Sequence, residues 1–189
     1  HAGIIGRPMP PEADMPTTLA FLKTPGWEVA SADAREALET ALTRLSEAGI
    51  AIMSAEDDAD VARIEKLLRE SLSLTRRINA WESRWPLNTY VDKDKSKLSS
   101  GMVERLHEAQ AMSVDDYRQD ILRREEIRAA YASLANKAEC CITLSAPDVA
   151  PVGLDSTGNP IFVVQGSLLG VPTLSLPLIT LHGLPLGIQ

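Results

Sequence analysis

Lysine and serine side chains stand close together in the stretch DKDKSKLSS, residues 92–100. A serine hydroxyl becomes a nucleophile when a base removes its proton, and a lysine acts as that base only when burial or a nearby charge lowers its pKa. Lys95 and Lys97 lie beside Ser99 and Ser100, but the polar composition of the stretch predicts a solvated loop that would bury neither lysine. We therefore assign no Ser-Lys catalytic pair to this loop.

Thiols and imidazoles, the usual ligands of transition metals, are few in this chain. Cys140 and Cys141 are the only cysteines, and the histidines are single and scattered, at His1, His107 and His182. Adjacent cysteines rarely bridge each other, so a disulfide framework is excluded. Metal sites combine separated ligands at characteristic spacings, which this sequence lacks. We predict no metal and no other cofactor, and we interpret both thiols as buried core groups.

Aromatic and basic side chains come together in WESRWP, residues 81–86. Two tryptophans at this spacing could stack on a ligand. A tryptophan beside an arginine more often packs against the protein with a cation-π contact. We favour packing, at the end of a helix predicted from residue 57 to residue 80.

The charge balance limits the kinds of partner. The formal net charge is -7 and the pI is about 5.0, whereas a protein that neutralises phosphates needs clustered lysine and arginine. The pairs Arg76-Arg77 and Arg123-Arg124 lie beside acidic residues in helical patterns. No apolar run reaches the ~18 residues of a spanning helix, and the start does not resemble a signal peptide. We predict a cytoplasmic protein with no nucleic-acid and no membrane partner.

Early in the chain the pattern indicates a strand, a helix and a second strand. Leu19–Leu22 is apolar, Ser31 can cap a helix whose alanine and leucine side chains recur at helical spacing up to Gly49, and Ile50–Met53 is apolar again. Such a βαβ unit implies parallel pairing with a right-handed crossover. Residues 1–17, rich in proline and glycine, are interpreted as a connector.

Further along, a second long helix and a third strand are predicted. Ser113 and Asp116 have the spacing of a capping box for a helix that runs to about residue 138. Residues 140–144 are uniformly apolar, which is typical of a central strand. The loop at the carboxyl end of this strand is where open α/β sheets bind their ligands.

The last 35 residues combine a cap, a short helix and two strands. Asn159 followed by Pro160 is typical of a helix start, and Gly170 of a helix end, which bounds a helix over residues 161–169. Residues 173–178 and 184–189 are predicted to be strands, and both are apolar enough to belong inside a large sheet. Because the chain starts without methionine and stops inside an apparent strand, we interpret it as a fragment.

The sequence resembles the amidase signature hydrolases over residues 18–189. The resemblance is carried by LAFLKTPGWEVASADAREALETALTRLSEAGI, by WPLNTY, and above all by STGNP, LGVP and GLPLGIQ near the end. The match is to the C-terminal half of the family's domain. It implies an α/β fold with a mixed sheet covered by helices, which includes the βαβ unit and a helical cover.

The resemblance also implies where chemistry takes place. Family members carry a Ser-Ser-Lys triad in a Gly- and Ser-rich signature of the N-terminal half, which this sequence lacks, so the triad is expected upstream of His1 and no residue here is assigned as catalytic. The C-terminal half is expected to supply part of the pocket wall for a small-molecule amide substrate, with Phe162, Gln165 and Ser167 as candidates. Packing explains Phe162 equally well, whereas Gln165 is a polar group on an apolar helix.

Three functions follow as hypotheses. The first is the C-terminal portion of an amide hydrolase whose parent protein acts through a serine acyl-enzyme, and the fragment alone is expected to be inactive. The second is a non-catalytic binding or structural module. The third is the amidase subunit of a tRNA-dependent amidotransferase, which the acidic balance disfavours. Unpaired sheet edges predict self-association, so a homo-oligomer is an open possibility.

Overall fold

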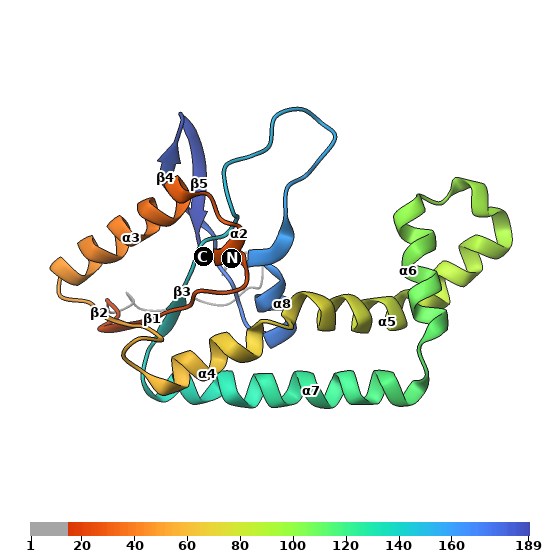
Figure 1. The fold of residues 1–189 in the computed structure, drawn as a ribbon, viewed down its shortest axis with the longest axis horizontal. Helices are drawn as coiled ribbons and strands as arrows, with labels where there is room; N and C mark the ends of the chain where they lie inside the picture. Colours follow the sequence, from red (N-terminus) through yellow and green to blue (C-terminus); the bar gives the residue numbers. More distant parts are fainter. Residues whose placement is uncertain (1–14) are drawn as a thin grey trace, which may run out of the picture.

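The computed structural model describes residues 15–189, so most of the connector predicted for residues 1–17 lies outside the described residues. Helices dominate this part of the chain (Figure 1). The α-helices are α2 (Gly26–Val29), α3 (Ala32–Glu47), α4 (Ala59–Leu68), α5 (Ser71–Asp94), α6 (Ser100–Ala111), α7 (Val114–Ala132) and α8 (Val164–Leu169). The short 3₁₀ helices are η1 (Lys95–Lys97), η2 (Ser133–Asn136) and η3 (Pro160–Phe162).

The strands form a parallel sheet and an antiparallel hairpin. They are β1 (Thr18–Phe21), β2 (Ala51–Met53), β3 (Cys140–Ile142), β4 (Leu176–Leu181) and β5 (Leu184–Ile188). The three-stranded sheet has the order β2-β1-β3, with Leu19 opposite both Ile52 and Cys140. Strand β4 pairs with β5 in antiparallel fashion. The predicted βαβ unit of β1, α3 and β2 is confirmed.

The hairpin joins the parallel sheet just beyond β3. The amide of Thr143 donates to the carbonyl of Gln189 at 2.9 Å, the amide of Gln189 donates back to Thr143 at 2.8 Å, and Leu144 forms an antiparallel bridge with Ile188. Parallel and antiparallel pairing therefore meet along one chain segment, which confirms the mixed sheet.

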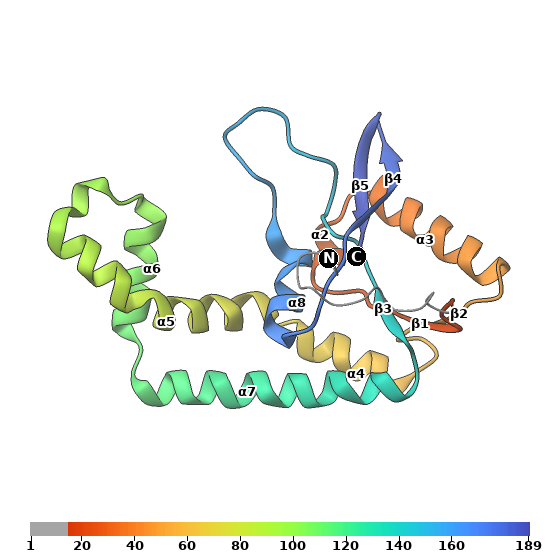
Figure 2. The same ribbon diagram turned by 180° about the vertical axis from the view of Figure 1, so that it is seen from behind.

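Two apolar clusters cover opposite faces of the sheet. On β1, Leu19 and Phe21 belong to the cluster that also contains Leu38 of α3, while Ala20 and Leu22 belong to the other cluster. This alternation follows from the two-residue period of a strand. Helix α3 and the hairpin lie on one side, and α4 and α7 on the other, as the two opposite views show (Figures 1 and 2).

Helix α3 forms where the sequence predicts it. The Ser31 hydroxyl accepts a hydrogen bond from the amide of Ala34 at 3.2 Å, and Gly49, with φ of 92°, follows the helix end. Leu38 is fully buried against the sheet, and the burial of a leucine side chain contributes about 1.5–3 kcal/mol.

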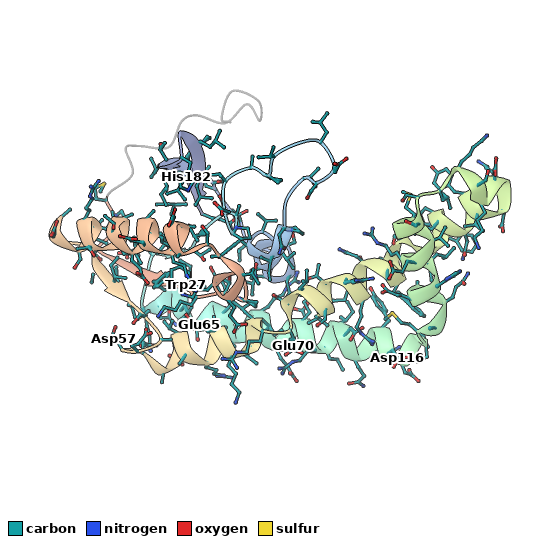
Figure 3. The ribbon with its side chains drawn as sticks, turned by 45° about the horizontal axis from the view of Figure 1, so that its top comes forward. Trp27, Asp57, Glu65, Glu70, Asp116 and His182 are labelled. Carbon is teal, nitrogen blue, oxygen red and sulfur yellow. The ribbon has the colours of Figure 1, made fainter. Side chains whose placement is uncertain are left out.

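The prediction of a single helix over residues 57–80 is wrong in two respects: the helix is interrupted, and its second part extends beyond residue 80. It breaks at Arg69 and Glu70 into α4 and α5. A straight helix would turn Ile78 about 100° away from the face that holds Val61, and the break allows both side chains to be buried. Figure 3 shows Glu70 at this junction, facing α7, where its carboxylate accepts from the Arg123 guanidinium.

Helix α5 continues through the tryptophan stretch to Asp94, although Pro86 lies inside it. An internal proline removes a backbone hydrogen bond and costs about 3 kcal/mol, which packing against α6 and α7 offsets. The stretch predicted as a loop over residues 92–100 is accordingly mostly helical, because η1 follows directly and Ser99 caps α6.

Of the two tryptophans in α5, Trp81 packs against the protein as predicted, and Trp85 does not. The Arg84 guanidinium lies 3.5 Å from the centroid of the Trp81 ring, which stacks on Tyr117 of α7 at 5.4 Å. Trp85 is 79% exposed. The predicted cation-π contact is therefore present at Trp81.

Helix α7 begins at the predicted capping box. The Asp116 carboxylate accepts from the Ser113 amide at 2.8 Å, and the Ser113 hydroxyl accepts from the Asp116 amide at 3.1 Å. Figure 3 shows Asp116 at the far end of α7 from the sheet. The α-helix ends at Ala132 and continues as η2 to Asn136, close to the predicted end.

Three expectations about the strands and thiols are wrong. Strand β3 stands at an edge of the three-stranded sheet, not at its centre, because the hairpin pairs only with the residues that follow it. Cys140 is exposed and Cys141 half-buried. Strand β4 starts at Leu176, later than predicted, and most of it is exposed, with Leu178 at 70%, because its outer face has no cover among the described residues.

Candidate binding pocket

A pocket of about 500 Å³ lies along β3 and beside β1, and α8 and residues 171–176 form its other wall. Its walls are mainly aliphatic. The lining residues are Leu19, Leu22, Thr24, Leu68, Tyr131, Glu139, Cys140, Cys141, Ile142, Thr143, Gln165, Gly166, Leu169, Val171, Pro172, Thr173, Leu174, Leu176, Ile188 and Gln189. Both the volume and the apolar lining are typical of small-molecule sites.

Three polar atoms in this wall have no hydrogen-bond partner. They are the hydroxyl oxygens of Thr24 and Thr143 and the side-chain carbonyl oxygen of Gln165. The three residues are only 2%, 7% and 4% exposed. A buried polar group without a partner costs about 1–3 kcal/mol, so three of them in one pocket require an explanation.

Each of the three residues is held by neighbouring backbone or side chains. Thr24 follows β1, and its carbonyl oxygen accepts from the amide of Trp27 at 2.8 Å as α2 begins. Thr143 follows β3 and is fixed by its paired hydrogen bonds with Gln189. The Gln165 amide nitrogen donates to the hydroxyl of Ser71, which is fully buried, at 3.2 Å.

Two glycines of α8 allow the wall to close. A Cβ atom on Gly166 would lie 2.4 Å from the methyl group of Thr173, so only glycine lets residues 171–176 pack this closely on the helix. Gly170 has φ of 70° and ends the helix in the left-handed region, as predicted, and Asn159 caps η3 as predicted. The helix itself is shorter than the expected 161–169, because residues 160–162 are 3₁₀.

The pocket carries little charge. Glu139 is the one charged lining residue, and its hydrogen bonds to Thr17 and the amide of Thr18 lower the pKa of its carboxyl. Burial raises the pKa of the Cys141 thiol, and burial together with the nearby thiols raises that of the Tyr131 hydroxyl. Both groups therefore stay neutral at pH 7.

Of the predicted wall residues, the structure places only Gln165 in the pocket lining. Phe162 is fully buried in the core cluster on the α3 side, with its ring so close to Gly26 that an added Cβ would approach within 2.6 Å. Ser167 is exposed. Sequence reasoning missed Thr24, which follows a predicted strand, and Thr143, which lies near the end of the strand predicted over residues 140–144, where α/β sheets bind ligands.

Other candidate groups have structural roles. The Ser99 hydroxyl accepts from the amide of Met102 at the start of α6, and Lys97, 81% exposed, pairs with Asp94 at 3.5 Å. Within residues 15–189, no three histidine, cysteine or acidic side chains gather as metal ligands. Over the same residues, no helix is both long and apolar enough to cross a membrane.

Comparison with known proteins identifies the architecture. No family model matches the sequence, and no curated protein matches it. Among solved structures, a crystal structure of an amidase superposes on 99% of this chain with a TM-score of 0.81 and 20% sequence identity. The chain has the fold of the C-terminal part of an amidase.

A second amidase structure supports the same conclusion. A bacterial aryl acylamidase of the amidase signature family covers 91% of the chain with a TM-score of 0.68 and 12% identity. The chain spans 44% and 39% of the lengths of these two proteins. The α/β fold class that the sequence motifs implied is therefore confirmed, as the C-terminal portion of an amidase signature fold.

Proposed function

We propose that this chain is the C-terminal portion of an amide hydrolase of the amidase signature type. The observation that carries the proposal is the superposition of nearly the whole chain, 99%, on the C-terminal part of an amidase. The motifs STGNP, LGVP and GLPLGIQ support it independently, because they mark the η3 start, the end of α8 and strand β5.

In this proposal the catalytic groups lie outside the chain. The Ser-Ser-Lys triad belongs to a preceding part of a longer polypeptide, where the nucleophilic serine attacks the amide carbonyl, the amine leaves with a proton, and water releases the acyl group. The roles found for Ser99 and Lys97, a helix cap and a surface ion pair, support this placement. The chain alone is inactive.

The contribution of this chain is the pocket wall for a small-molecule amide. Gln165 is the residue that we propose to contact the substrate, because it lines the pocket and its buried side-chain carbonyl oxygen has no hydrogen-bond partner. Phe162 packs in the core, and Ser167 is exposed and does not line the pocket. The acidic net charge of -7 disfavours nucleic-acid and anionic-membrane partners, and a cytoplasmic location stays a separate prediction.

The gene that encodes the chain tests the proposal. We expect codons upstream of His1 for a Gly- and Ser-rich segment that contains the nucleophilic serine, with a lysine before it. An open reading frame that encodes no such segment would contradict the amidase function and favour the non-catalytic module.

A further inference from the structure

We propose that the outer edge of β3 binds an extended strand from a part of the longer polypeptide outside residues 1–189. The strand would pair antiparallel to β3, next to the end of β5. The inference rests on the proposed function only for the existence of that longer polypeptide, and it concerns the assembly of the sheet rather than the substrate.

The backbone of the β3 segment faces two different neighbours. The carbonyl of Ile142 faces β1, because it accepts from the amide of Leu22 at 3.0 Å, whereas the amide of Thr143 faces β5 and donates to Gln189 at 2.9 Å. Backbone groups of a strand point to opposite edges at alternate residues. The N–H and C=O of Cys141, two residues before Thr143, therefore point to the same edge as those of Thr143.

This edge is unoccupied at Cys141 among residues 15–189. Strand β3 pairs with β1 on one side, and the ladder with β5 covers only Thr143, Leu144 and Ser145 on the other. An unpaired edge is a template for a further strand. The ladder also sets the register, because one residue of the added strand would exchange two backbone hydrogen bonds with Cys141, as Gln189 does with Thr143.

The surroundings of the edge favour an apolar strand. Residues 139–143 line the pocket, and its other wall includes Leu174 and Leu176, which are 70% and 43% exposed. Apolar side chains on the added strand would remove these leucines from water, which is favourable in proportion to the area buried. The strand would extend the β3 wall of the pocket, which faces the α8 wall that carries Gln165.

A second copy of the chain fits this edge poorly. Among residues 15–189 of such a copy, the outermost strands are β2, with three residues, and β4, which contains Pro177. Proline has no N–H to donate to a ladder. A segment of the same polypeptide can instead enter the pocket as a single strand, and its linkage reduces the entropy cost of pairing.

Hydrogen exchange at the Cys141 amide tests the inference. NMR compares the 189-residue chain with the longer polypeptide that its gene encodes, and the amides of Ile142 and Thr143 serve as references because they face β1 and β5. In the chain alone, we expect Cys141 to exchange much faster than both. In the longer polypeptide, its exchange should slow by at least about 100-fold, independently of protein concentration.

A charge on the neighbouring wall should release the strand. Leu174→Lys in the longer polypeptide should speed exchange at Cys141 by at least about 10-fold. Leu122→Lys is the matched control, because Leu122 is 58% exposed on α7 and does not line the pocket, and it should leave the exchange rate unchanged.

The inference is overturned if Cys141 exchanges equally fast in both proteins, if it is already protected in the dilute chain alone, or if the two lysine variants exchange alike. Protection that increases with protein concentration would identify a second copy as the occupant and would also overturn it. A longer polypeptide that hydrolyses amides but leaves Cys141 unprotected contradicts only this inference. One that protects Cys141 but lacks the signature serine contradicts only the proposed function.

Discussion

The polar side chains of the pocket lining are held in place by hydrogen bonds within the protein. Thr143 is fixed by backbone pairing with Gln189, and Gln165 by the buried hydroxyl of Ser71. Because these supports are independent of any ligand, the polar atoms are preorganised, which reduces the entropy cost of binding. Gly170, which ends α8 in the left-handed region, also shapes the pocket wall.

Replacement of Gly170 by alanine should destabilise the protein. Its φ of 70° is unfavourable for other residues, and a Cβ would lie 2.9 Å from the guanidinium of Arg128, which bonds the Leu168 carbonyl. We expect a loss of about 1–2 kcal/mol in the free energy of unfolding, measured by urea denaturation. Gly101→Ala is the control, because no atom lies within 4 Å of the place that a Cβ on Gly101 would take. This substitution should be neutral or stabilising. Equal effects would contradict this explanation.

Glu56 should titrate far below an ordinary glutamate. Its hydrogen bond with Lys23, 2.6 Å long, lowers the pKa of its carboxyl to about 2, with a smaller contribution from Ser54. The associated stability is present above the unfolded pKa of ~4.3 and is lost as pH falls toward 2. The carboxyl is 62% exposed, so solvent screening keeps the gain small.

NMR titration of the Glu56 side chain measures this pKa directly. In the Lys23→Met variant, the pKa should return toward the usual value of ~4.3. A Glu56 pKa that is the same with and without the lysine ammonium would show that this hydrogen bond does not cause the shift.

At the scale of elements, local signals specify helix starts better than helix ends. Ser31, Ser113 and Asn159 all accept backbone amides where the sequence places caps. Caps depend on residues only two or three positions away, so the sequence contains them. The break at Glu70 and the helical path through Pro86 depend on α7 and α6, which lie far along the chain, and sequence pattern alone did not predict either.

The capping box of α7 can be tested by one substitution. Ser113→Ala removes the acceptor of the Asp116 amide and the partner of its carboxylate, and it should lower the free energy of unfolding by about 1 kcal/mol. Ser113→Thr keeps a hydroxyl and should lose much less. Urea denaturation followed by circular dichroism gives both values, and an unchanged Ala variant would show that the cap is dispensable.

At the scale of the whole molecule, the pocket was only partly predictable. The parallel pairing of β1 and β2 follows from the βαβ pattern, whereas the edge position of β3 does not. Gln165 is recognisable as a polar residue on an apolar helix. Thr24 and Thr143 are 119 residues apart in the sequence, and nothing local distinguishes them from other threonines. Their shared pocket is visible only when the strands are assembled.

The hairpin gives the molecule an exposed apolar face. Leu174 and Leu178 are each 70% exposed, and Leu176 and Leu184 more than 40%. Together with the outer edges of β2 and β4, which have no partner strand among residues 15–189, this face predicts self-association.

Sedimentation velocity at increasing concentration measures this association. Leu178→Lys should shift the chain toward monomer, because it places a charge on the apolar face. Leu122→Lys is the control, since Leu122 is 58% exposed on α7, away from the hairpin. A strictly monomeric profile for the unmodified chain would refute the prediction.

We propose that this chain supports, but does not perform, amide hydrolysis. The most direct test compares hydrolysis of a simple amide by the 189-residue chain and by the longer polypeptide that its gene encodes. The account predicts turnover by the longer protein, lost when its signature serine is replaced, and none by the chain alone. Hydrolysis by the purified 189-residue chain, or an inactive longer protein that contains the signature, would contradict it.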